Sequence, residues 1–120
     1  MLAKLGVLLM DEDHAALERM FGDVDTTPDA DLPQLFEAVA AELAAHFARE
    51  EKAMTQARVP ILLAHIELHQ QILIEVARMR RAIAAESPEA ARQLLGAFLP
   101  ALIEQHVATA DSATAHFLRG

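Results

Sequence analysis

The sequence predicts an all-α protein: an up-down-up-down antiparallel four-helix bundle with a short apolar arm at its amino terminus. Apolar residues make up 53% of the 120 residues but aromatic residues only 4%, and the abundant Ala, Leu, Ile and Val suit helices that pack on helices. Long stretches of helix-forming residues contain almost no glycine. Gly, Pro and Asp gather at three places instead, and these connections divide a single domain, residues 1–120, into four helical segments.

Capping residues and prolines place the four expected helices. They span residues 12–21, 32–57, 61–85 and 88–118. Asp11 can cap the first helix, and Asp31, with a glutamine three residues later, has the spacing of a capping box for the second. Pro60 suits the start of the third helix, and Ser87-Pro88 combines a cap with a first-turn proline for the fourth. The second and third connections are short, so the helices that they join must be antiparallel neighbours.

Pro100 lies inside the fourth expected helix, where it removes one backbone donor and clashes with the preceding turn. Gly96 lies four residues earlier. We therefore expect a kink at this point, the alternative being a break of the helix near Leu99.

The first ten residues, MLAKLGVLLM, are apolar with a single Lys. A secretory signal is one interpretation, but the apolar run is short, no small-residue cleavage site follows it, and a polar segment begins at Asp11. We favour an arm, residues 1–10, that packs along the bundle. No stretch approaches the ~20 apolar residues of a membrane-spanning helix, so we expect a soluble, cytoplasmic protein.

Charge and cysteine content exclude several classes of function. The formal net charge is −8, with 10 Lys and Arg, and this argues against binding to nucleic acid or to anionic membrane surfaces. Cysteine is absent. A disulfide framework is therefore excluded, and any metal site must use His and carboxylate ligands.

The arrangement of the histidines is the main functional signal. Three pairs of possible metal ligands lie on the expected helices: His46 with Glu50, His65 with His69, and His106 with Asp111. The first two pairs are four residues apart, which places both members on one face of a helix. The third pair is five apart, about 140° around the axis at ~100° per residue, and fits less well.

The depth of these residues in the bundle is a stronger test. Glu50 lies nine residues before Val59, at the second connection, and His69 lies ten residues after it. His69 lies 18 residues before Ser87, at the third connection, and His106 lies 19 residues after it. Antiparallel neighbours place such residues at one level, to within about one residue or ~1.5 Å. Three helices therefore converge on one layer.

Buried imidazoles and carboxylates at one level are costly unless hydrogen bonds or a metal satisfy them. We therefore expect a metal site. The alternative is a set of His and carboxylate stripes on the surface. The position of His14 along the first helix agrees less well with this level. The first connection is long, however, and allows His14 to reach the other candidate ligands. His116 and Glu51 fall outside the ligand pattern, and we expect both at the surface.

With His14, the pairs form the order H, HxxxE, HxxxH, HxxxxD, which resembles the hemerythrins and specifically the single-domain bacterial form, bacteriohemerythrin. Further matches are residues 9–17 (LMDEDHAAL), residues 46–54 (HFAREEKAM) and Pro60. The resemblance spans about residues 9–118. A related cation-binding family shares the frame but usually ends its last motif in Glu at a spacing of four, so Asp111 favours hemerythrin proper.

The resemblance implies a four-helix fold that holds two non-haem iron ions. One iron would be bound by His65, His69 and His106, the other by His14 and His46, and both would be bridged by Glu50, Asp111 and an oxo or hydroxo group. The iron with two imidazoles would keep one position open for O2 or another diatomic partner.

Five neutral imidazoles and two carboxylates leave a ferrous pair with net positive charge, whereas carboxylate-rich ferritin-like sites are closer to neutral. A site with fewer negatively charged ligands stabilises high-valent iron less well, and this favours reversible O2 binding. We expect O2 storage, delivery or sensing by a non-enzymatic protein that is a monomer or weak oligomer. The alternative is an enzyme that handles peroxide or nitric oxide at the same centre. The absence of a nearby acid–base residue outside the ligand set favours the first.

Apolar side chains are expected around the diatomic ligand: Leu17, Phe47, Leu102 and Val107. A dry pocket slows loss of the bound ligand and entry of water. Hemerythrins commonly carry Trp near the amino terminus and in the last helix, and this sequence has none. The volume of the pocket and the O2 affinity therefore do not follow from the resemblance.

Overall fold

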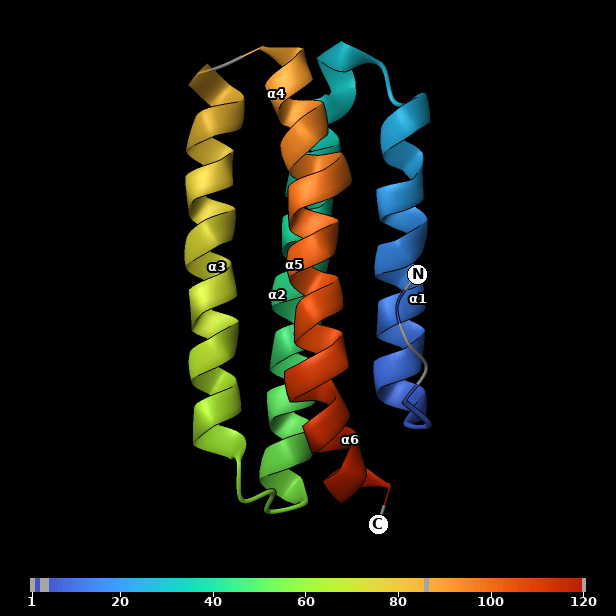
Figure 1. Ribbon diagram of the computed structural model, residues 1–120, viewed down its shortest axis with the longest axis vertical. Coiled ribbons are helices and arrows are strands. Elements are labelled where there is room, and N and C mark those ends of the chain that lie inside the picture. Colours follow the sequence, from blue (N-terminus) through green and yellow to red (C-terminus); the bar gives the residue numbers. More distant parts are fainter. Residues whose placement is uncertain (1, 3–4, 86, 120) are drawn as a thin grey trace.

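The computed structural model describes residues 2, 5–85 and 87–119. Four helical rods lie side by side in a molecule of 45 × 23 × 19 Å (Figure 1). The helices are α1 (Leu8–Gly22), α2 (Leu32–Gln56), α3 (Leu62–Ala85), α4 (Pro88–Gln93), α5 (Leu99–His106) and α6 (Ser112–Leu118). Short 3-10 turns at Asp23–Thr26 and Asp29–Asp31 connect α1 to α2, and π-helical turns at Leu94–Phe98 and Val107–Asp111 join α4, α5 and α6 into the fourth rod. The predicted all-α four-helix bundle is confirmed.

The amino-terminal helix begins earlier than its expected cap. α1 starts at Leu8, and Asp11 lies inside its first turn. The Asp11 carboxylate accepts hydrogen bonds from the backbone N–H groups of Leu5 (2.8 Å) and Gly6 (3.0 Å). The predicted capping role is therefore wrong: Asp11 holds the preceding arm, and its charge also suits the amino end of a helix. Residues 1, 3 and 4 of the expected arm lie outside the described residues.

The caps expected for the second and fourth rods have different outcomes. Asp31 precedes α2 but makes no capping hydrogen bond, because its backbone is already near-helical (φ −98°, ψ −4°) and an N-cap needs an extended backbone. The predicted capping box is wrong. Ser87 does have an extended backbone (φ −74°, ψ 161°), and its hydroxyl accepts from the Ala90 N–H at 3.4 Å. The predicted cap of the fourth rod is confirmed.

The carboxyl end of α2 has an unusual residue in a common motif. The N–H of Val59 bonds to the Met54 carbonyl (3.0 Å), and that of Arg58 to the Thr55 carbonyl (3.2 Å). This is the Schellman arrangement, which reverses the chain through a left-handed residue that is usually glycine. Here that residue is Arg58, with φ 53°. The backbone is strained at this one position.

Replacing Arg58 by glycine should raise the free energy of unfolding by about 0.5–1 kcal/mol, because glycine adopts positive φ without a steric cost. Ala57→Gly is the matched control: Ala57 has right-handed φ −85° in the same turn, so glycine there should destabilise by about 0.5–1 kcal/mol. Urea denaturation of the metal-free protein measures both. Equal shifts of the two variants in the same direction would contradict the left-handed assignment.

Pro100 is accommodated by a widened turn. The helix continues past it, so the alternative of a break near Leu99 does not occur. In the π turn Leu94–Phe98, the Leu99 N–H bonds to the Leu94 carbonyl, five residues back, just before the proline that has no N–H. Gly96 lies in this turn, and a Cβ there would lie 3.2 Å from Val24 Cγ1. The missing side chain thus lets the fourth rod approach the first connection.

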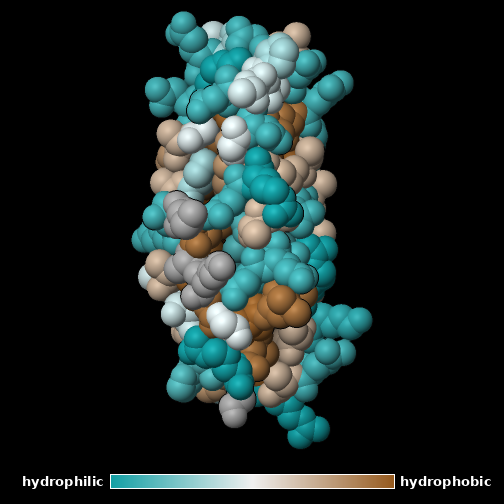
Figure 2. Space-filling view, turned by 90° about the vertical axis from the view of Figure 1, so that its right-hand side faces the viewer, coloured by the Kyte–Doolittle hydropathy of each residue, from teal (hydrophilic) through white to brown (hydrophobic). Residues whose placement is uncertain are grey.

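The interior of the bundle is built from apolar side chains of the helices. Val39, Leu43, Phe47 and Met54 of α2 are each at most 2% exposed. In the view from the side of α1, polar side chains cover most of the surface, and apolar ones emerge toward the end at which α1 begins (Figure 2). Among the described residues, none of the helices has both the length and the apolar character needed to cross a membrane.

Candidate metal centre

The structure brings all seven residues singled out in the sequence into one buried cluster. At most 7% of each residue is exposed, and the seven are His14, His46, Glu50, His65, His69, His106 and Asp111. We call them the ligand cluster. The ends of its side chains meet inside the bundle, although they come from α1, α2, α3 and the fourth rod. His116, which lies outside the pattern, is exposed as expected.

The two carboxylates occupy the centre of the ligand cluster. Glu50 Oε1 lies 2.6 Å from His65 Nε2 and 3.3 Å from His69 Nε2, and its Oε2 lies 3.2 Å from His46 Nε2. Asp111 Oδ1 lies 3.0 Å from both His106 Nε2 and His65 Nε2, and its Oδ2 lies 3.1 Å from His14 Nε2. Each carboxylate therefore contacts imidazoles from more than one helix.

Ligand atoms within 4.8 Å of one another form two overlapping groups. They are His65, His69 and His106 with Glu50 and Asp111, and His14 and His46 with the same two carboxylates. Each group has enough nitrogen and oxygen donors for one metal ion, and each carboxylate offers one oxygen to either ion. Each group could therefore hold a metal ion, and the two groups have Glu50 and Asp111 in common.

The five-residue spacing between His106 and Asp111 is explained by a local distortion. Residues Val107–Asp111 form a π turn, in which the Ser112 N–H bonds to the Val107 carbonyl five residues back. Because the π turn has about one residue more than an α-helical turn, Asp111 lies on the same helix face as His106. In a regular α-helix the two residues would be about 140° apart around the axis. π turns often occur at functional sites.

The hydrogen bonding of the ligand cluster is incomplete in a way that fits metal ions. Among the residues that the structure describes, seven buried side-chain atoms have no hydrogen-bond partner: His14 Nδ1, His65 Nε2, His69 Nε2, His106 Nε2, both Glu50 oxygens and Asp111 Oδ1. The imidazole nitrogens lie near carboxylate oxygens, but the directions do not suit hydrogen bonds. Unpaired buried polar atoms are costly, and a cation that takes these lone pairs removes the cost. Six of the seven are donor atoms directed into the ligand cluster, so the residues fit two metal ions.

Charge coupling in the ligand cluster shifts its pKa values. Burial alone would raise the pKa of Glu50, but contacts with three imidazoles outweigh it and hold the pKa at about 2. Burial opposes ionisation of Asp111 too, yet His106 and other imidazoles hold its pKa far below the usual range. Burial would lower the pKa of His65, but Asp111 and Glu50 raise it to about 9. Metal ions must therefore displace protons, so metal affinity should rise with pH.

Three imidazoles are held on their outer side by hydrogen bonds. A ring that ligates through Nε2 carries its proton on Nδ1 and donates from there. His46 then donates to Asp13 (2.9 Å), His69 to Glu51 (2.7 Å) and His65 to the Thr114 hydroxyl (2.5 Å). These contacts fix the ring orientations and strengthen the nitrogen donors.

The roles of these outer residues were not expected from the sequence. Glu51 was expected at the surface, and its side chain is 31% exposed, but its carboxylate also contacts His69. Asp13 is 13% exposed and also receives two hydrogen bonds from Arg49, at 2.8 and 3.1 Å. The available signal was adjacency along the chain: Asp13 precedes His14, and Glu51 follows Glu50.

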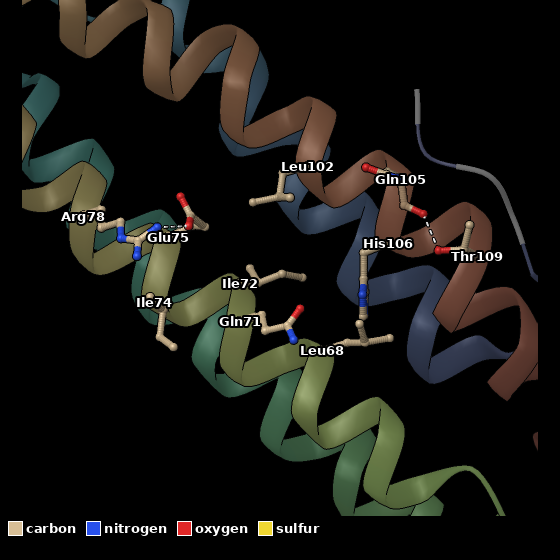
Figure 3. Close-up of a pocket in the computed structure, with 10 residues that line it drawn as sticks. All are labelled: Leu68, Gln71, Ile72, Ile74, Glu75, Arg78, Leu102, Gln105, His106 and Thr109. Atoms are coloured by element: carbon tan, nitrogen blue, oxygen red, sulfur yellow. Dashed lines mark hydrogen bonds and ion pairs between the residues drawn. The ribbon is translucent and has the colours of Figure 1, made fainter.

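The four residues expected around the diatomic ligand have different positions. Leu17, Phe47 and Val107 are at most 2% exposed. Phe47 stacks on His69, with ring centroids 4.0 Å apart and planes at 11°. Leu102 is partly exposed and lines a surface cavity that also borders His106 (Figure 3). Their role as a pocket for a diatomic ligand stays a prediction.

A helical bundle with a buried cluster of His, Glu and Asp defines a metal-binding four-helix protein. Comparison with known families agrees: the model of the hemerythrin HHE cation binding domain matches residues 5–115. This chain therefore belongs to the hemerythrin family. No significant similarity to a curated protein or to a solved structure was found.

Proposed function

We propose that the ligand cluster binds two iron ions and that the ferrous pair binds O2 reversibly, for storage, delivery or sensing. The supporting observation is the pair of overlapping donor groups that share Glu50 and Asp111. One ion would take the three imidazoles of His65, His69 and His106. The other would take His14 and His46.

The donor composition supports iron and a reversible reaction. Imidazole and carboxylate donors suit iron, and two ferrous ions when bound supply the electrons that hold O2. Five neutral imidazoles against two carboxylates give a less anionic site than ferritin-like centres have, which disfavours high-valent iron and substrate oxidation. The group with only His14 and His46 has one imidazole fewer, so its ion is the one we expect to accept the diatomic ligand.

The chain's own residues would hold the rings and exclude water. Hydrogen bonds that the Nδ1–H groups of three imidazoles donate to Asp13, Glu51 and Thr114 keep the Nε2 atoms directed inward. Phe47 covers one face of His69. Such apolar shielding slows hydrolytic side reactions and proton leakage at the centre.

The alternative, an enzyme handling peroxide or nitric oxide, needs an acid–base group beside the reacting ligand. Glu51 is a carboxylate outside the ligand cluster, but it contacts Nδ1 of His69, on the side of the ring opposite to Nε2. It is therefore not placed to exchange a proton with a molecule bound at the open position of the ion held by His14 and His46. This position favours O2 binding over turnover.

The test is anaerobic loading with ferrous iron followed by exposure to air. We expect two irons per chain and a visible charge-transfer band that appears in air and disappears when O2 is removed, over repeated cycles. Zinc-loaded protein is the control and should stay colourless. Irreversible bleaching in the first cycle, or catalytic consumption of peroxide or nitric oxide, would overturn the proposal in favour of the enzyme.

A further inference from the structure

A surface groove lies between α3 and the fourth rod, beside the ligand cluster. Its cavity volume is about 560 Å³. Side chains of α3 form one wall, and those of α5 and the following π turn form the other (Figure 3). This volume is within the range of about 300–1,000 Å³ that is usual for small-molecule sites. His106 lies in the wall of the groove and so connects it to the ligand cluster.

His106 differs from the three imidazoles with outer partners. Its Nε2 is buried and lies 3.0 Å from Asp111, as the ligand role requires. Within the described part of the chain, its Nδ1 has no hydrogen-bond partner. Unlike the seven unpaired atoms described above, this atom is not fully buried. The side chain is 6% exposed and borders the groove. Nδ1 therefore has its access to solvent through the groove, and with Nε2 on a metal it carries a proton to donate.

The walls of the groove are partly apolar, and the cation that borders it is paired. Leu68, Ile72, Ile74 and Leu102 supply apolar surface, and Gln71, Gln105 and Thr109 add neutral polar groups. Arg78 is engaged by Glu75 at 2.6 Å, and the chain as a whole has net charge −8. An anionic ligand would have no unpaired positive partner and would be repelled at long range. The groove therefore favours a neutral, largely apolar molecule that presents a hydrogen-bond acceptor to His106.

We propose that this groove binds a small neutral carbonyl compound, of the class to which quinones belong. Its carbonyl oxygen accepts the hydrogen bond from His106 Nδ1, and its ring packs between Leu68 and Leu102. The added hydrogen bond increases the donor strength of His106, so occupancy of the groove is sensed at the ligand cluster. This inference rests on metal binding at Nε2, the first half of the proposed function, and not on O2 binding.

The experiment uses the zinc-loaded protein, which is diamagnetic and does not bind O2. We would titrate ¹⁵N-labelled protein with tetramethyl-1,4-benzoquinone and follow backbone amides and imidazole nitrogens by NMR. Saturable shifts are expected for groove residues, together with a shift of the His106 Nδ1–H resonance. Tetramethylbenzene has the same ring and methyl groups but no carbonyl, and it should bind at least tenfold more weakly, corresponding to a lost hydrogen bond of about 1.4 kcal/mol.

Two leucines of α3 provide matched variants. Leu68→Gln, in the groove, should weaken quinone binding about tenfold. Leu63→Gln replaces an 80% exposed leucine of the same helix outside the groove and should leave binding unchanged. Absence of saturable shifts, equal binding of the hydrocarbon, or equal weakening by both variants would each overturn the proposal. None of these outcomes depends on iron or O2, so failure here is distinguishable from failure of reversible O2 binding.

Discussion

Replacing Glu50 by alanine is expected to remove both metal ions from the protein. Glu50 belongs to both donor groups, and its two oxygens lie 2.6 Å from His65 and 3.2 Å from His46. In the proposed two-ion site, loss of the carboxylate would remove one bridging ligand and one negative charge from between the two cations. The metal affinity should fall by more than about 100-fold, beyond the 10–100-fold effect typical of outer residues. Metal content after gel filtration and calorimetric titration with Fe²⁺ measure the change.

Two controls separate loss of the bridge from loss of the fold. Glu50→Gln keeps nearly the same volume but removes the charge, and it should also lose metal. Glu67→Ala replaces an exposed glutamate of α3 and should retain two ions per chain. Circular dichroism should show the same helix content for all three variants. Retention of both ions by Glu50→Ala would contradict the bridging role.

Glu51→Gln should weaken metal binding by about 10–100-fold while leaving the bundle folded. The Glu51 carboxylate accepts the proton of His69 Nδ1 at 2.7 Å, and an amide in its place is a weaker acceptor that can also turn its NH₂ group toward the ring. His69 then loses its fixed tautomer and part of its donor strength. Titration with Fe²⁺ and with Zn²⁺ measures the effect for two metals.

The matched comparison for Glu51 is again Glu67. Glu67→Gln makes the same chemical change at an exposed position of α3 and should not alter the affinity. Glu51→Asp keeps the charge on a shorter side chain and should recover part of the loss. If Glu51→Gln and Glu67→Gln bind metal equally well, the contact with His69 has no role in ligation.

The outer partners of the ligand cluster are not equivalent in charge. Asp13 receives two hydrogen bonds from Arg49, which also bonds to Glu42 at 2.9 Å. Burial would raise the pKa of Asp13, but contacts with Arg49 and His46 lower it. The negative charge behind His46 is thus shared with a guanidinium. Among the described residues, no Arg or Lys forms an ion pair with Glu51. We therefore expect the Glu51 carboxylate to change metal affinity at His69 more than Asp13 changes it at His46.

The regular part of the structure could be predicted because it depends on local chemistry. Helix-forming stretches, three connections and a serine–proline cap determine four rods, and short connections make neighbours antiparallel. The spacing of four in His46–Glu50 and His65–His69 places each pair on one face in any α-helix. Counting from the connections then brings Glu50, His69 and His106 to one level, as the structure has them.

Other features depended on contacts or backbone conformations that no local pattern shows. Asp31 does not cap α2 because the 3-10 turn before it sets a near-helical backbone, and Asp11 instead bonds to the arm. The π turn that aligns Asp111 with His106 inserts one extra residue into a helical turn. Such a turn forms only where the surrounding packing stabilises it.

Local patterns in the sequence were thus enough to predict the four-helix class, the hemerythrin family and the seven residues that meet in the ligand cluster. The groups on the outer side of the imidazoles could be seen only in the folded chain: Asp13 and Glu51 contact two of the rings, and a groove lies beside His106. The difference comes from distance along the chain. Helical spacing acts over a few residues, whereas the orientation of an imidazole depends on side chains that reach it from other helices.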